Sequence, residues 1–123
     1  MANNQHRSIR MVSGKKYIAG NKQKAHELGG LAANTIVADV RVKAKRVMGG
    51  NTKLSLLSAN KVIIANGKTT KTAIIESVTE NPANIHFTRR NVMTKGTIVK
   101  TDLGEVIITS RPGQSAQLFG KLK

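Results

Sequence analysis

Two adjacent arginines, Arg89 and Arg90, follow the turn dipeptide Asn81-Pro82, and Lys95 comes shortly after them. A guanidinium carries a planar fork of N–H donors that fits phosphate oxygens bidentately, and it also stacks on nucleobases. Neighbouring side chains of a regular strand point to opposite faces, so a strand here would turn one arginine inward. The spacing therefore predicts a turn or one helical turn that Pro82 stiffens, with both arginines reaching solvent. The alternative is that one arginine bonds carbonyls of the turn.

A second set of cations alternates with apolar residues between residues 35 and 45. Ile36, Val40 and Val42 share the apolar parity, which predicts a strand with an apolar inner face and a basic outer face. Alternate residues on one face lie about 7 Å apart, close to the spacing of phosphates along a nucleic-acid backbone. The alternative is a solvated strand face, but no acidic residue interrupts the basic stretch after Asp39. We predict phosphate contacts from Arg41, Lys43, Lys45, Arg46 and Lys53.

Catalytic chemistry has little support in the sequence. The three histidines, His6, His26 and His86, have no mutual spacing that would face two of them onto one metal ion, and there is no cysteine. No glycine-rich loop has the spacing that cradles a nucleotide. We therefore expect no enzymatic activity, no metal, no cofactor and no small-molecule substrate.

The net charge points to a polyanionic partner. The chain has 123 residues with 21 Lys and Arg against 6 Asp and Glu, a formal net charge of +15. A compact domain with this excess repels itself unless a polyanion supplies the missing negative charge. Nucleic acid is the favoured partner, with an anionic membrane surface a distant second. No apolar run is long enough to span a bilayer, and the N-terminus MANNQHRSIR lacks the apolar stretch of a secretory signal, so we expect a cytoplasmic protein.

Aromatic residues are almost missing, while β-branched residues are plentiful. Tyr17, Phe87 and Phe119 are the only three rings. Val, Ile and Thr suit a pleated sheet, so the pattern predicts a small all-β core that includes Phe87. Three scattered rings cannot form a base-stacking platform, and the expected binding mode is therefore contact with the nucleic-acid backbone by charge and shape.

The spacing of apolar runs and turn residues predicts an all-β domain over residues 35–123. Glycines mark the turns at Gly49-Gly50-Asn51, Asn66-Gly67 and Asp102-Leu103-Gly104, and a bulge is expected at Lys45-Arg46. Short, evenly spaced antiparallel strands favour a closed barrel, which leaves few exposed edges. We predict a six-stranded antiparallel barrel followed by a short C-terminal tail, with strands near residues 35–45, 53–58, 60–65, 69–78, 96–101 and 105–110.

Residues 1–34 form a different region, rich in Asn, Gln, Lys and Gly and without sustained apolar periodicity. One short helix is predicted from Asn21 to Leu28, ended by Gly29. The rest is interpreted as a basic arm that buries too little apolar surface to order itself and becomes ordered on RNA. Its predicted RNA-binding residues are Arg7, Arg10, Lys15, Lys16, Lys22 and Lys24.

Several motifs resemble one ribosomal protein family. They are Asn81-Pro82-Ala83-Asn84, Arg89-Arg90-Asn91, Thr94-Lys95-Gly96 and Thr109-Ser110-Arg111-Pro112-Gly113-Gln114. Together they resemble the archaeal and eukaryotic "e" type of small-subunit ribosomal protein eight, and the short length is similar to the archaeal form. The resemblance covers essentially the whole chain. It implies a small β-barrel with an extended arm and adds Arg111 to the expected RNA-binding residues.

The same resemblance implies a structural constituent of the small ribosomal subunit that supports translation. Its expected partners are small-subunit ribosomal RNA and neighbouring small-subunit proteins, and its expected location is the ribosome in the cytoplasm. The alternatives are a ribosome-assembly factor related to a large-subunit biogenesis protein, an architectural DNA-binding protein, and, with the weakest support, an RNA-modifying enzyme. An architectural protein would be expected to dimerise and to insert apolar wedges into the minor groove of DNA.

Overall fold

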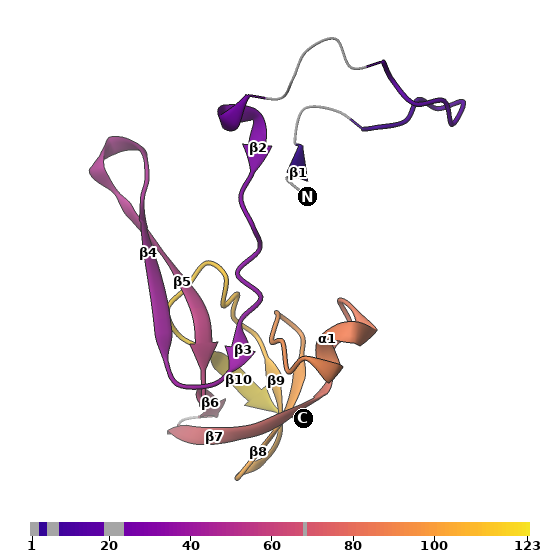
Figure 1. Cartoon of the computed structure of the whole chain (residues 1–123). Helices are drawn as coiled ribbons and strands as arrows, with labels where there is room; N and C mark the ends of the chain where they lie inside the picture. Colours follow the sequence, from indigo (N-terminus) through magenta and orange to yellow (C-terminus); the bar gives the residue numbers. More distant parts are fainter. Residues whose placement is uncertain (1–2, 5–7, 19–23, 68) are drawn as a thin grey trace. The chain divides into compact units, whose positions relative to one another are not determined.

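The chain divides into two compact units, Met1–Ala32 and Ala33–Lys123, which we describe separately. The computed structural model describes residues 3–4, 8–18, 24–67 and 69–123, with the backbone only at residues 3, 4 and 66 (Figure 1). Within these residues no helix has the length and apolar character that a membrane crossing requires.

The described residues of the first unit include two very short strands and a 3-10 turn. β1 (Asn3–Asn4) pairs antiparallel with β2 (Leu28–Gly29), and a 3-10 turn, η1 (Ala25–Glu27), precedes β2. The prediction of a helix from Asn21 to Leu28 is wrong at its C-terminal end, where a 3-10 turn and the start of β2 are found instead. Its predicted N-cap, Asn21, lies outside the described residues. The Glu27 carboxylate accepts a hydrogen bond from the backbone N–H of Lys24 at 3.0 Å, which closes a single turn, and Leu28 is then taken into the ladder with β1.

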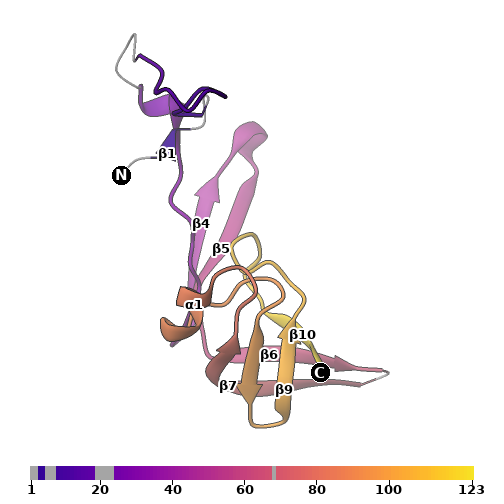
Figure 2. The same ribbon diagram turned by 90° about the vertical axis from the view of Figure 1, so that its right-hand side faces the viewer.

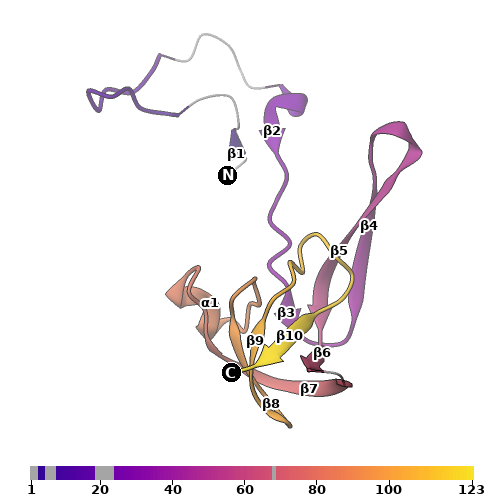
Figure 3. The ribbon, with the colours of Figure 1, turned by 180° about the vertical axis from the view of Figure 1, so that it is seen from behind.

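The second unit is built on a closed barrel of five strands (Figures 1 and 3). The strands are β6 (Lys61–Asn66), β7 (Thr69–Glu80), β8 (Ile98–Thr101), β9 (Gly104–Ile108) and β10 (Phe119–Leu122). Their order around the barrel is β10-β6-β7-β8-β9, and β10 closes it by pairing antiparallel with β9 and parallel with β6. The prediction of an all-β barrel is confirmed.

Three details of the predicted barrel are wrong. The pairing is not antiparallel throughout, because β10 runs parallel to β6. The barrel has five strands rather than six, and the segment predicted to be a C-terminal tail supplies β10. The sequence of β10, FGKL, is too short and irregular to show a strand pattern. Its Gly120 is required by packing, because a Cβ there would lie 2.4 Å from Cγ1 of Val106 and 3.1 Å from the carbonyl oxygen of Ile107.

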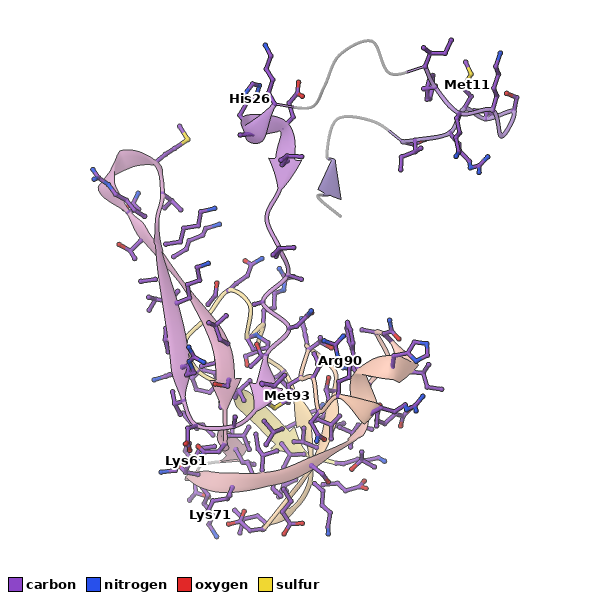
Figure 4. The ribbon with its side chains drawn as sticks, viewed as in Figure 1. Met11, His26, Lys61, Lys71, Arg90 and Met93 are labelled. Carbon is purple, nitrogen blue, oxygen red and sulfur yellow. The ribbon has the colours of Figure 1, made fainter. Side chains whose placement is uncertain are left out.

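The barrel core is aliphatic. Phe87 is only half-buried and lies outside the core cluster, and Phe119 is exposed, so the prediction that Phe87 belongs to the core is wrong. The side chains that fill the interior come from the barrel strands and from the segments that cover its ends; they include Leu56, Val62, Ile64, Ala73, Ile75, Met93, Val99, Val106, Ile108 and Leu118. In Figure 4, Met93 lies among these packed side chains.

A separate three-stranded sheet precedes the barrel in sequence. It consists of β3 (Ile36–Val37), β4 (Arg41–Arg46) and β5 (Thr52–Ala59), in the order β3-β5-β4. β3 runs parallel to β5, and β4 pairs antiparallel with β5 to form a hairpin that projects beyond the barrel (Figures 1 and 2). The first two predicted strand regions are therefore outside the barrel.

The predicted inner face of the segment 35–45 is also wrong. The chain bends after β3, and every residue of β4 is exposed, including Val42 at 45%. The alternation of apolar and basic residues correctly predicted an amphipathic strand. However, β4 is the edge strand of a projecting hairpin, and no barrel strand covers its apolar side. The register shift lies between Arg41 and Val42 rather than at Lys45-Arg46.

The predicted glycine turns are present, one of them with a shifted register. At the end of the β4–β5 hairpin, η2 (Met48–Gly50) contains Gly49 and Gly50 at φ +71° and +75°. Between β6 and β7, Asn66 pairs with Thr69, so Asn66 belongs to the strand ladder and the turn begins after it rather than at Asn66-Gly67. Gly67 has φ +59°, a conformation that glycine adopts without the steric cost of a side chain.

Candidate nucleic-acid interface

Arg89 and Arg90 lie at the end of a short helix, α1 (Ile85–Arg89), as predicted from their spacing. The Asn84 side chain caps its start by accepting a hydrogen bond from the backbone N–H of His86 at 2.9 Å. Both arginines are exposed, and Figure 4 shows Arg90 beside α1. Within the described part of the chain, neither guanidinium makes an ion pair or a hydrogen bond. The alternative that one of them bonds turn carbonyls is therefore wrong for these residues.

The turn that carries the arginines is held mainly by Asn81. This side chain is only 5% exposed, and its Nδ2 donates to the Val92 carbonyl at 2.9 Å. Its Oδ1 accepts hydrogen bonds from the Ala83 N–H and the Thr94 hydroxyl, both at 3.0 Å. Sequence reasoning credited Pro82 with stiffening this turn and missed Asn81. The signal was present, because Asn side chains often close a turn onto the backbone two residues later.

Lys95 is placed by a second tight turn next to the first. The Thr97 hydroxyl accepts from the Thr94 N–H at 2.9 Å, and the Gly96 N–H donates to the Ile108 carbonyl at 2.7 Å. Gly96 has φ +87° and lies beside the Pro82 ring. Lys95 is exposed at this turn, so the structure brings it onto the same pair of linked turns as the two arginines.

The β4–β5 hairpin carries the second group of predicted residues, all of them exposed. On one face Lys43 lies opposite Ser55, and Lys45 lies directly opposite Lys53. Like charges directly opposite on an antiparallel pair destabilise it. No acidic residue occurs between residues 41 and 58 to relieve this repulsion.

Arg111 lies on a loop that is fastened to the same hairpin. The backbone N–H of Leu56 donates to the Pro112 carbonyl at 2.9 Å, and the Ser55 hydroxyl donates to the Gly113 carbonyl at 2.8 Å. Because Ser55 is also the ladder partner of Lys43, these bonds hold the exposed Arg111 near the base of the hairpin.

β3 connects the arginine turn to the hairpin. The Val37 N–H donates to the Asn91 carbonyl at 3.2 Å, and the Met93 N–H donates to the Thr35 carbonyl at 2.7 Å. On its other side, the buried Thr35 hydroxyl donates to the Leu56 carbonyl at 2.6 Å. The hairpin, the Arg111 loop and the α1 region therefore project from one end of the barrel, as Figures 1 and 2 show.

The predicted RNA-binding cations of this unit lie in segments without acidic residues, although Asp39 precedes Arg41 by two residues. The segments 41–58, 81–97 and 109–119 contain no acidic residue, and we call their nine cations the basic set: Arg41, Lys43, Lys45, Arg46, Lys53, Arg89, Arg90, Lys95 and Arg111. The acidic residues of the barrel lie outside these segments. Two of them form ion pairs there, Glu76 with Lys100 at 3.0 Å and Glu105 with Lys123 at 3.2 Å.

The first unit places its predicted cations less uniformly. Lys15, Lys16 and Lys24 are exposed, whereas Arg10 donates from Nη1 to the Gly14 carbonyl at 2.8 Å and so helps to close a turn. Arg10 also forms an antiparallel bridge with Lys16. Arg7 and Lys22 lie outside the described residues.

The chemistry available to the basic set is the binding of anionic oxygens. Exposed guanidinium and ammonium groups without protein partners donate charge-assisted hydrogen bonds to phosphates. The described residues contain no cluster of three or more His, Cys, Asp or Glu that could hold a metal ion.

Comparison with known proteins identifies the family of this chain. The sequence pattern of the family described as Ribosomal protein S8e matches residues 4–122. The chain is 45% identical over 112 residues to the small ribosomal subunit protein eS8 of Methanocorpusculum labreanum, covering 89% of this chain and 90% of that relative. It is 42% identical to the eS8 of Methanobrevibacter smithii, covering 99% of each, and 40% identical to that of Haloquadratum walsbyi, covering 96% of this chain and 94% of the relative.

The fold and the comparisons define a β-barrel protein of the ribosome. The chain belongs to the ribosomal protein S8e family, and the resemblance found from its motifs is confirmed. This is a family of ribosomal structural proteins, which agrees with the prediction that the chain is not an enzyme.

Proposed function

We propose that this protein is a structural constituent of the small ribosomal subunit that binds small-subunit ribosomal RNA through contacts with the RNA backbone and thereby supports translation. The basic set is the RNA-binding surface of the barrel unit. The hairpin contacts one backbone segment, and the turns that carry Arg89, Arg90 and Lys95 contact a second.

The gathering of cations in segments without acidic residues is the observation that carries this proposal. Nine exposed cations lie in three acid-free segments at one end of the barrel, while the acidic residues of the barrel lie elsewhere. Lys45 and Lys53 lie opposite each other, so their ammonium groups repel. A phosphate bound between the two groups would reduce this repulsion. The hydrogen bonds of Asn81 hold the arginine turn in advance, so less conformational freedom is lost on binding.

We also propose a role for the first unit and for the surroundings of the protein. Residues 1–34 are the basic arm, which adds RNA contacts from Lys15, Lys16 and Lys24 and becomes fully ordered only on RNA. Residues 35–123 are the RNA-binding barrel domain. Within the cytoplasm the protein is bound to the ribosome, beside other small-subunit proteins.

The test measures RNA affinity as a function of salt. The probe is full-length small-subunit ribosomal RNA transcribed from an archaeal gene, and the variant is the triple change Lys43→Ala, Lys45→Ala and Lys53→Ala. We expect weaker binding and a salt slope that is shallower by about two, since each phosphate contact contributes about 0.7–0.9 to the slope. The double variant Arg89→Ala and Arg90→Ala should reduce the slope by about one to two for the same reason.

A matched control separates local contacts from overall charge. The triple change Lys61→Ala, Lys71→Ala and Lys121→Ala removes the same charge from exposed positions on the barrel strands. Figure 4 shows Lys61 and Lys71. It should change the slope much less than the hairpin triple. Equal effects of the two triples would mean that binding follows net charge alone and would contradict the proposed surface. Sedimentation of the protein only with precursor particles, and not with mature small subunits, would contradict the structural role and favour an assembly factor.

A further inference from the structure

The tip of the β4–β5 hairpin presents one apolar side chain among cations. Met48 is 92% exposed and begins η2, the turn that joins the two strands. The turn is closed by a hydrogen bond from the Val47 N–H to the Asn51 carbonyl at 2.8 Å and by one from the Asn51 side-chain amide to the Met48 carbonyl at 3.3 Å. The backbone at Met48 is therefore held in place while its side chain lies in solvent.

The hairpin carries Met48 well away from the barrel. The ladder continues from Val42 opposite Leu56 to Arg46 opposite Thr52, and at about 3.3 Å per residue the tip lies roughly 20 Å beyond Val42. The nearest charged residues in sequence on the two strands are Arg46 and Lys53, and both are basic. A surface that approaches the tip therefore meets positive charge first, which favours an anionic partner.

The two residues after Met48 leave room for that partner. Gly50 has no heavy atom within 4 Å of the position where a Cβ would stand, and beside Gly49 only the Asn51 side-chain amide approaches, at 3.5 Å. Single exposed apolar residues are ordinary on protein surfaces. Met48 differs from them because it stands at the end of a projecting hairpin, beside two glycines and between cations.

We propose that Met48 packs against the face of an unpaired nucleobase of small-subunit ribosomal RNA, while the cations of the hairpin bind the phosphates on either side. The thioether is apolar and polarisable, so it binds aromatic rings but neutralises no phosphate. Methionine is one of the apolar residues that nucleic-acid-binding proteins insert against bases, and unstacked bases are the usual targets in RNA. This inference rests on the proposed RNA-binding function and adds contact with a base to its backbone contacts.

The test compares Met48→Ala with wild type on the full-length archaeal small-subunit ribosomal RNA described above. Met48→Ala should weaken binding about fivefold, because the contact between the thioether and the base is lost, and should leave the salt slope unchanged because no charge is removed. Leu103→Ala is the control, since Leu103 is also an exposed apolar residue at a hairpin turn, between β8 and β9. The control should bind like wild type.

A second variant and a second measurement make the test specific for a base. Met48→Lys replaces the apolar contact by a charge, so its slope should become steeper by about 0.7–0.9 and its affinity should fall below wild type at high salt. Dimethyl sulfate modification of the RNA should show at least one adenine or cytosine that wild type protects and Met48→Ala leaves reactive. Hydroxyl-radical protection of the backbone beside it should be the same for both proteins.

The outcomes separate this inference from the proposed function. If Met48→Ala binds and protects the RNA like wild type while the hairpin lysine triple loses slope, the base contact is wrong and the backbone contacts stand. If neither variant changes binding, the hairpin is not an RNA-binding element, and both the base contact and the hairpin part of the proposed RNA-binding surface are wrong. Normal binding of Met48→Ala to naked RNA with defective incorporation into small subunits would assign Met48 to a protein contact and would overturn the base contact.

Discussion

The β4–β5 and β8–β9 hairpins are both antiparallel pairs with short connections, yet they use their residues in opposite ways. β8 and β9 contribute Val99, Val106 and Ile108 to the barrel core, each 0–1% exposed. Every residue of β4 is exposed, including its apolar ones. The β8–β9 hairpin therefore stabilises the fold. On the β4–β5 hairpin, the end of β5 near the barrel contributes Leu56 and Ala59 to the core, whereas β4 presents its side chains to the surroundings.

The two hairpins also differ in the charges that face each other across their strands. Lys100 lies directly opposite Glu105 on the β8–β9 ladder, whereas Lys45 lies directly opposite Lys53 on β4–β5. Opposite charges in cross-strand pairs are stabilising and like charges are destabilising. Lys100 and Glu105 also form ion pairs within the protein, with Glu76 and Lys123 respectively, whereas the described residues show no ion pair at Lys45 or Lys53. The β8–β9 hairpin contributes to the barrel core, and we propose that the β4–β5 hairpin binds RNA.

The largest effect on stability is expected from a change at the barrel closure. Gly120→Ala would place a Cβ 2.4 Å from Cγ1 of the buried Val106, so either the valine or β10 must move. We expect the free energy of unfolding to fall by about 3 kcal/mol, at the upper end of the usual cost of overpacking. Urea unfolding followed by circular dichroism would measure it. A loss below about 1 kcal/mol would mean that β10 is not tightly packed against β9.

A matched pair of valines sharpens the comparison between the hairpins. Val106→Ala removes buried methyl groups and leaves a cavity, so we expect a loss of about 2 kcal/mol in the free energy of unfolding. Val42→Ala makes the same chemical change at a side chain that is 45% exposed and should cost about 0.5 kcal/mol. Equal losses in urea unfolding would show that β4 is part of the folding core and would break the comparison.

The smallest effect is expected when the β4–β5 hairpin is given a charge pair like that of β8–β9. Lys53→Glu places a carboxylate opposite Lys45, which should raise the free energy of unfolding by less than about 1 kcal/mol. The same change should weaken RNA binding, because it removes one cation and adds one anion. Lys53→Gln is the control that removes the charge without adding the opposite one. If Lys53→Glu left the free energy of unfolding unchanged and bound RNA more strongly, the proposed role of Lys45 and Lys53 in RNA binding would be wrong.

Much of the fold could be predicted from local patterns. The β-branched runs and glycine turns predicted the strands from 53 to 110, and the adjacent arginines predicted a helical turn, because these features depend on neighbouring residues. Asn81 was missed because its role depends on distant partners, Val92 and Thr94, that only the folded chain brings within hydrogen-bond distance. That the basic set binds RNA remains a prediction; the structure shows only where these residues lie.

The sequence by itself determined the family, the all-β class and the positive charge, because motifs, strand periodicity and composition are properties of the chain alone. Only the tertiary structure decided which strands close the barrel. Val42 and Val106 both belong to short strands with apolar alternation, yet one is exposed and the other is fully buried. The reason is that burial depends on what packs against a strand: β10 and its Gly120 complete the barrel around Val106, while β4 ends its sheet as an edge.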